Sequence, residues 1–399
     1  MSSGIGGSRM RFRLWRAGGV LLIASVLLTG CWNKYELTEL GFVMGVAIDK
    51  GKDGTVQLTT QIYMPQQSGS SSSERSFDSN INVVTTSSTN LRAARSIGAE
   101  LGRKAQWSHM RVILVSEEMA RTVNLGELLD LFYRDPEPRL TASILITKGS
   151  ASRYLLKQPT IEQTTSQQIK RSEDASARNA ALTVNSNLLA LGKQLRSVTG
   201  NAIAAYIEPH PTDEEGFRVI GTALIHKGKL VDKLSGKLSR GLLMLTNDFT
   251  LGTIDVRCEE RPEGKGKQNK IESFEVSHYR SSIKPRIEND RLVISVDSEV
   301  KGSVTELKCS ALTTREQEER FARRTEEAIR QEMEQTFAVL QRRKLDMLQL
   351  GNRIYRHNPK LWFQVQPQWE DYISHAELNV HVRVRMNTTG TMIGKPVFE

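Results

Sequence analysis

The sequence predicts a multi-domain protein of mixed α/β and α+β class, in which mixed sheets are covered by helices. In the first half, short apolar runs typical of buried strands alternate with segments whose apolar residues recur every three or four positions, as in helices. In the second half, strands of alternating apolar residues precede a long charged helix, which indicates a C-terminal antiparallel sheet with a long helix. The length of 399 residues is typical of two or three domains.

The chain begins with the features of a secretory signal. Four arginines precede an apolar run at 17–28, and Leu28-Thr29-Gly30 stands directly before Cys31. The run has about a dozen residues, fewer than the roughly 20 that span a bilayer. The spacing resembles a bacterial lipobox, which implies cleavage before Cys31 and a diacylglyceryl group on its thiol. We therefore expect a signal peptide over 1–30 and a lipid anchor with a short tether over 31–40; the alternative is an ordinary signal with an incidental cysteine.

Composition describes a globular body behind this anchor. Hydrophobic residues make up 38% and charged residues 25%, and no second apolar run approaches spanning length. The net charge is +10, or about +6 without the four signal arginines, which suits an anionic membrane surface. A solvated surface of mixed charge explains it equally well. Export and the lack of an arginine-aromatic patch argue against nucleic acid as the binding partner of this basic charge.

Cys258 and Cys309 leave two interpretations open. An exported protein permits a disulfide between them. Neither lies in a CxxC motif, which argues against metal or redox chemistry. We favour two buried free thiols over a bonded pair.

An N-terminal α/β domain is expected over 41–208. Its strands and helices alternate, which favours a partly parallel sheet covered by helices. Lys52-Asp53-Gly54 supplies a hairpin turn, and the serine-rich segment 68–76 reads as a loop. In chain order, the expected elements are strands at 41–49 and 55–64, a helix from Asn90, a strand at 110–115, a helix at 125–132, a strand at 141–147, and polar helices at 164–177 and 188–196.

Two further units are expected after 208–216, whose Pro, Asp, Glu and Gly content is typical of a linker. The first is a small β-rich middle unit over 216–258, too short to bury a core without a neighbour. The second is a C-terminal α+β domain over 271–399, beyond the charged stretch 259–270. Its expected elements are strands at 271–279, 283–288 and 292–300, a long helix from Thr314, a helix at 346–357 and a strand at 376–386.

The sequence contains no clear catalytic or metal-binding motif. The seven histidines are scattered, and neither HExxH nor GxSxG occurs. Ser281 and Lys284 fit an SxxK pattern, but its partner motifs are missing and Lys284 precedes Pro285, which favours extended backbone. Asp130, Asp135 and Glu137 are neighbouring carboxylates that are explained more simply as loop caps. We predict no catalysis, no cofactor, no metal, and folding without a bound ion.

Several segments, in order, resemble the Ger(x)C family of spore germination lipoproteins, the C subunits of nutrient germinant receptors. They are Cys31-Trp32 with Glu36-Leu37 and the strand at 41–50, His109-Met110-Arg111-Val112, Arg134-Asp135-Pro136-Glu137, Lys148-Gly149-Ser150-Ala151, Gly221-Thr222-Ala223, Arg240-Gly241-Leu242-Leu243, and Asn358-Pro359-Lys360-Leu361-Trp362 with the closing strand to Gly390. The resemblance carries no role for Cys258 or Cys309.

The resemblance implies an acylated lipoprotein on the outer face of the spore inner membrane, assembled with integral membrane subunits and without known catalysis. The alternative function is a lipid-anchored solute-binding protein that captures a small nutrient directly. Such proteins usually have two similar lobes around a cleft, whereas the two halves of this chain differ. The sequence therefore favours the receptor subunit and leaves a small-molecule ligand open.

Overall fold

The computed structural model describes residues 15–16, 18–19, 35–64, 80–213, 216–258 and 270–388. Cys31 and the serine-rich segment 68–76 lie outside the described residues. Contacts divide the chain into two units, 1–40 and 41–399. In the first unit, the short 3-10 helix η1 (Leu37–Glu39) is capped where the backbone N–H of Glu36 donates to the Glu39 carboxylate at 3.0 Å.

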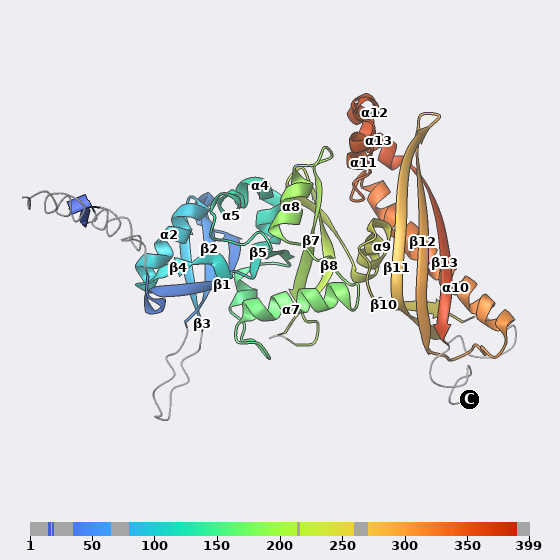
Figure 1. Ribbon diagram of the computed structural model, residues 1–399, viewed down its shortest axis with the longest axis horizontal. Coiled ribbons are helices and arrows are strands. Elements are labelled where there is room, and N and C mark those ends of the chain that lie inside the picture. Colours follow the sequence, from blue (N-terminus) through green and yellow to red (C-terminus); the bar gives the residue numbers. More distant parts are fainter. Residues whose placement is uncertain are drawn as a thin grey trace, which may run out of the picture. The chain divides into compact units, whose positions relative to one another are not determined.

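The second unit contains two sheets, labelled in Figure 1. The first has nine strands in the order β3-β2-β1-β5-β6-β7-β8-β9, with β4 paired to β1. Strands β1, β5, β6 and β7 are parallel neighbours, and antiparallel strands flank them on both sides, so the expected mixed sheet is confirmed. The strands are β1 (Leu40–Lys50), β2 (Val56–Tyr63), β3 (Asn80–Ser87), β4 (Lys104–Gln106), β5 (Val112–Ser116), β6 (Ser143–Thr147), β7 (Asn201–Pro209), β8 (Phe217–His226) and β9 (Lys229–Leu234).

Helices cover both faces of the first sheet, because its central strands are apolar on both sides. In β5, Val112 and Leu114 face one core, while Ile113 and Val115 face the other. The Leu114 side packs with α6 (Ser152–Leu155) and α7 (Thr165–Arg178). The opposite side packs with α2 (Asn90–Leu101), α3 (Glu117–Thr122), α4 (Leu125–Leu128), α5 (Asp130–Arg134) and α8 (Leu188–Leu195).

The segment expected as a linker over 208–216 connects β7 to β8, and these two strands pair as antiparallel neighbours in the first sheet, with Pro209 opposite Phe217. The middle unit expected over 216–258 is divided between the two sheets. Strands β8 and β9 complete the first sheet, whereas α9 (Gly236–Thr246) and β10 (Gly252–Arg257) pack in the core of the second.

The second sheet has the order β10-β11-β12-β13. We expected a wholly antiparallel sheet, but this sheet is mixed. Strands β10, β11 (Ile271–Glu288) and β12 (Arg291–Glu306) pair antiparallel, but β13 (Glu377–Thr388) runs parallel to β12. A parallel neighbour requires a crossover connection, which the helices between β12 and β13 provide.

Strand β11 is continuous over the two strands expected at 271–279 and 283–288. Its partner β10 covers only 271–276. At Pro285, β11 therefore pairs on one side alone, with Ile294 of β12. Proline has no N–H to donate, and it is tolerated at this position because the other side of β11 has no neighbouring strand in the described part of the chain.

The crossover begins with the long helix α10 (Arg315–Arg342), which Figure 1 shows against the second sheet. The helix begins after Thr314, as expected, and the Thr314 hydroxyl caps it by accepting the Gln317 N–H. Its apolar stripe, including Phe321, Ile329 and Met333, is buried in the core of the second sheet. The chain continues through α11 (Leu350–His357), α12 (Pro359–Val365) and α13 (Trp369–Ser374).

Cys258 and Cys309 form a disulfide with a Cα–Cα distance of 6.1 Å, so our preference for free thiols is wrong. Cys258 follows β10 and Cys309 follows β12, and strand register brings both to the same end of the sheet. Glu272 of β11 fixes this end by accepting the N–H groups of Lys308, Cys309 and Ser310 at 2.8–3.1 Å. Burial opposes its ionisation, but these bonds and the Ser310 hydroxyl lower the pKa of Glu272 below its ordinary value.

Replacing Cys258 with serine is expected to lower the free energy of unfolding by about 2–5 kcal/mol, because the bond joins residues 51 positions apart. Urea unfolding of the purified protein without reductant measures this loss. Cys309→Ser is the matched variant, and the double variant should lose no more than either single one. Additive losses would show that the two sulfurs act independently and would contradict the pairing.

Candidate functional site

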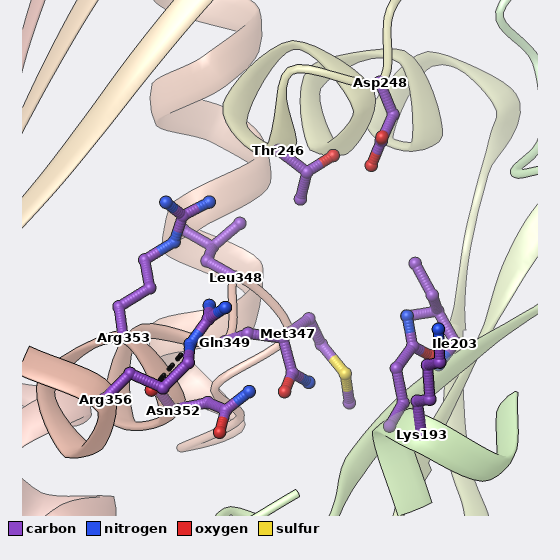
Figure 2. Close-up of a pocket in the computed structure, with 11 residues that line it drawn as sticks. Lys193, Ile203, Thr246, Asp248, Met347, Leu348, Gln349, Asn352, Arg353 and Arg356 are labelled. Atoms are coloured by element: carbon purple, nitrogen blue, oxygen red, sulfur yellow. Dashed lines mark hydrogen bonds between the residues drawn. The ribbon is translucent and has the colours of Figure 1, made fainter. Parts of the chain in front are cut away.

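A hollow of about 270 Å³ opens between the helical crossover and the first sheet (Figure 2). One wall comes from α8 and β7, and the other comes from the end of α9, the loop after α10, and α11. Arg343 and Asp232 form an ion pair at 2.8 Å between the same two parts of the fold. The lining residues are Lys193, Gln194, Ile203, Thr246, Asp248, Met347, Leu348, Gln349, Asn352, Arg353 and Arg356.

The lining is predominantly cationic. Lys193, Arg353 and Arg356 are opposed by a single carboxylate, that of Asp248. Figure 2 shows Arg353 and Arg356 on α11, Lys193 across the hollow on α8, and Asp248 beside the end of α9. The Nε of Arg356 donates to the carbonyl oxygen of Asn352 on its own helix at 3.4 Å, a long bond that leaves its charge unpaired by any described carboxylate.

Arg353 occupies the least favourable position for a cation in this pocket. Its Nε is buried and has no hydrogen-bond partner within the described part of the chain. Burial lowers the pKa of its guanidinium and the neighbouring charge of Arg356 lowers it further, while Asp346 and Asp248 partly offset both effects. The described residues therefore compensate the positive charge of Arg353 only in part.

Asp346 fixes the loop between α10 and α11, which forms part of the α11 wall of the pocket. Its fully buried carboxylate accepts the N–H groups of Leu350 and Gly351 at 2.8 Å, and the indole N–H of Trp369 at 3.1 Å. Burial raises the pKa of Asp346, and the three hydrogen bonds oppose that rise. The next contact crosses to the first sheet, where the Gln349 side chain donates to the carbonyl oxygen of Asn201 at 2.7 Å.

The segment from Asn358 to Trp362 supports the same wall. Asn358 caps α12 by accepting the Leu361 N–H at 3.1 Å, and Pro359 occupies the first turn. The Trp362 ring then packs on Gly351, where a Cβ would lie 2.5 Å from it. Its centroid lies 5.2 Å from that of Trp369, so a buried aromatic pair backs α11.

Comparison with known proteins identifies the family. The domain described as "Spore germination protein N-terminal domain" matches residues 33–209, and "Spore germination B3/ GerAC like, C-terminal" matches residues 220–390. The chain belongs to the Ger(x)C family of spore germination proteins. The resemblance in the sequence is thereby confirmed.

Relatives of this Ger(x)C protein occur in Bacillus subtilis (strain 168). Spore germination protein B3 is 26% identical over 385 residues, which cover 94% of this chain and 98% of the relative. Spore germination protein KC is 22% identical, with 93% and 95% covered. The crystal structure of the GerBC protein shares the fold, with a TM-score of 0.53, 19% identity, and coverage of 86% of this chain and 97% of that one.

The segments that carry the family resemblance mostly have structural roles here. Asp49 accepts the N–H groups of Ala151 and Ser152 at 2.7 and 2.8 Å, which fixes the start of α6. Asp135 accepts the Glu137 N–H at 2.9 Å, and Glu137 accepts that of Trp107 at 3.2 Å. The expected role of Asp135 and Glu137 as loop caps is confirmed, whereas Asp130 pairs with Arg134 within α5 at 2.6 Å.

The predicted site residues are not brought together. Cys31 lies outside the described residues, so its lipidation stays a prediction. Ser281 and Lys284 lie in the extended strand β11, and the Ser281 N–H donates to Asn247 at 2.5 Å. This backbone does not provide the helical turn that SxxK chemistry uses. No helix in the described ranges is long and apolar enough to cross a membrane.

Sequence reasoning missed the pocket. The available signal was the spacing of Arg353 and Arg356, which lie three positions apart and therefore on one face of α11. The opposite wall, at Lys193, lies about 160 positions earlier in the chain. No pattern among neighbouring residues in the sequence indicates that Lys193 and the two arginines of α11 line one pocket.

Proposed function

We propose that this protein is a lipid-anchored subunit of a spore germinant receptor, which acts in nutrient-triggered germination by assembling with membrane-embedded subunits and without catalysis of its own. The observation that carries the proposal is the match of both spore germination domains, at 33–209 and 220–390, in one chain. The coverage of the B. subtilis relatives over nearly their full lengths supports the same conclusion.

The anchor in this proposal is Cys31, and the location is the outer face of the spore inner membrane. The disulfide between Cys258 and Cys309 supports a location outside the cytoplasm, because cytosolic thiols are kept reduced. The tether from Trp32 to Glu39 reaches at most about 30 Å when extended. The folded body is therefore held in a thin layer above the bilayer, next to its partners.

The alternative, direct capture of a small nutrient, is favoured by one observation, the pocket beside α11. Its volume of about 270 Å³ lies just below the 300–1,000 Å³ typical of ligand sites. Its walls come from dissimilar halves of the chain, unlike the paired lobes of a solute-binding protein. We therefore keep assembly as the primary function and treat the pocket separately.

Co-purification tests the proposal. A tagged full-length chain is solubilised from spore inner membranes with mild detergent, and its companions are identified by mass spectrometry. We expect integral membrane subunits of a germinant receptor, at comparable molar amounts. A Cys31→Ala chain serves as the control for membrane-dependent assembly. Recovery of the wild-type chain without any membrane protein, or with a transport permease, would contradict the proposal.

A further inference from the structure

We propose that the pocket lined by Lys193, Arg353 and Arg356 is a binding site for a small oxyanion, of the size of inorganic phosphate or a short dicarboxylate. The site goes beyond the proposed assembly function. It rests on the cavity, on the charges that line it, and on a buried hydrogen-bond donor that has no partner among the described residues.

The unused donor is the first step of the argument. A buried polar group without a partner destabilises a fold, so native structures retain few of them. The Nε of Arg353 is such a group among the described residues, and it belongs to a side chain that lines the hollow. A guanidinium presents its donors in a planar fork that matches the oxygens of a phosphate or carboxylate.

The charge of the pocket sets the sign of the ligand. Three cations converge on the space, and Asp248 is the one carboxylate that lines it. Arg353 and Arg356 lie three positions apart on α11 and repel each other, and an anion between them would relieve that repulsion. The Gln194, Gln349 and Asn352 side chains add amide groups to the same lining.

The size of the pocket limits the ligand to a small one. A volume of about 270 Å³ is below the usual range for drug-sized molecules. Because the walls belong to α8 and β7 on one side and to α11 on the other, a bound anion would join two parts of the fold. Occupancy should therefore stabilise the protein as well as neutralise the pocket.

Calorimetric titration of the full-length protein in detergent, with inorganic phosphate and with malonate as probes, tests the site. We expect saturable binding of at least one probe, with a dissociation constant on the order of 1 mM. Arg353→Gln is expected to weaken that binding by about tenfold or more, because a charge-assisted bond is lost. Asp248→Asn is expected to strengthen it, because a repelling carboxylate is removed.

Arg286→Gln is the matched control, since Arg286 is an exposed arginine on β11 and does not line the pocket. Phosphate stabilises many proteins by exclusion from their surfaces, and such an effect would be equal in all variants. Thermal unfolding with and without the probe adds a second measurement, in which the probe should raise the unfolding temperature of Arg286→Gln more than that of Arg353→Gln.

Absence of saturable binding of both probes would overturn the proposal, as would equal affinities of Arg353→Gln and Arg286→Gln. Either result would leave the receptor-subunit function intact, because co-purification with membrane subunits tests that function separately.

Discussion

Replacing Cys31 with alanine is expected to remove most of the protein from the spore inner membrane and to impair nutrient germination. Each buried CH₂ of an acyl chain contributes about 0.8 kcal/mol to membrane binding, and stable anchoring takes two chains. The alanine variant has no thiol to acylate. The charge of the body, about +6 without the signal arginines, still attracts it to an anionic bilayer, but this attraction is weak and salt reduces it.

Immunoblots of membrane and soluble fractions, together with incorporation of radiolabelled palmitate, measure the effect. Thr29→Ser is the matched control, because it changes a neighbouring position but keeps a small residue before Cys31. It should leave both localisation and labelling unchanged. Label in the Cys31→Ala chain would show that the acylated residue lies elsewhere.

Replacing Glu332 with alanine is expected to cost about 3–5 kcal/mol of folding free energy, because it leaves a buried guanidinium without its carboxylate. Arg240 of α9 donates to both carboxylate oxygens of Glu332 on α10, at 2.8 and 2.6 Å, and to the carbonyl oxygen of Thr253 at 2.7 Å. The two side chains are only 10% and 6% exposed. Burial opposes the charge on Arg240, but the bonds to Glu332 outweigh it and raise the pKa of Arg240.

The close approach of the two helices makes this loss difficult to relieve. Gly241 follows Arg240, and a Cβ there would lie 2.6 Å from the carbonyl oxygen of Glu332. There is therefore little room for water to reach the guanidinium of Arg240 when Glu332 is replaced by alanine. The resemblance segment that begins at Arg240 thus marks a helix junction in the core of the second sheet.

Urea unfolding compares Glu332→Ala with Glu327→Ala, which removes the same residue type from an exposed ion pair with Arg330 on the same helix. Exposed pairs contribute about 0–1 kcal/mol, so the control should unfold almost as wild type does. Equal losses in the two variants would contradict the assignment of a structural role to the buried pair.

Much of the first sheet could be predicted from sequence because its central strands are continuous apolar runs. The strands at 112–116 and 143–147 are buried on both faces, and short hydrophobic runs indicate that arrangement directly. Strands β3 and β7 were missed for a local reason. The first, NINVVTTS, is polar and exposed on alternate positions, and the second, NAIAAYIEP, is rich in alanine, which has low strand propensity.

Features that depend on strand register or on distant segments could not be predicted. The disulfide requires the antiparallel alignment that sets Cys258 and Cys309 at one end of the second sheet. The pocket requires α8 and α11 to face each other. The parallel direction of β13 depends on the path of the chain through α11, α12 and α13. The alternation of apolar and polar residues along a strand does not indicate that direction.

The role of the anchor is tested most directly by germination rates in spores that carry Cys31→Ala alone or Cys31→Ala fused to an unrelated membrane anchor. Short tethering raises the effective concentration of the body toward membrane partners, to the millimolar range for a short linker. Contacts too weak to recruit a free protein would then suffice for assembly. We predict that the variant alone germinates slowly in response to nutrient and that the substitute anchor restores both assembly and rate. Restored membrane localisation without restored germination would contradict this account and would assign the acyl chains of Cys31 specific contacts of their own.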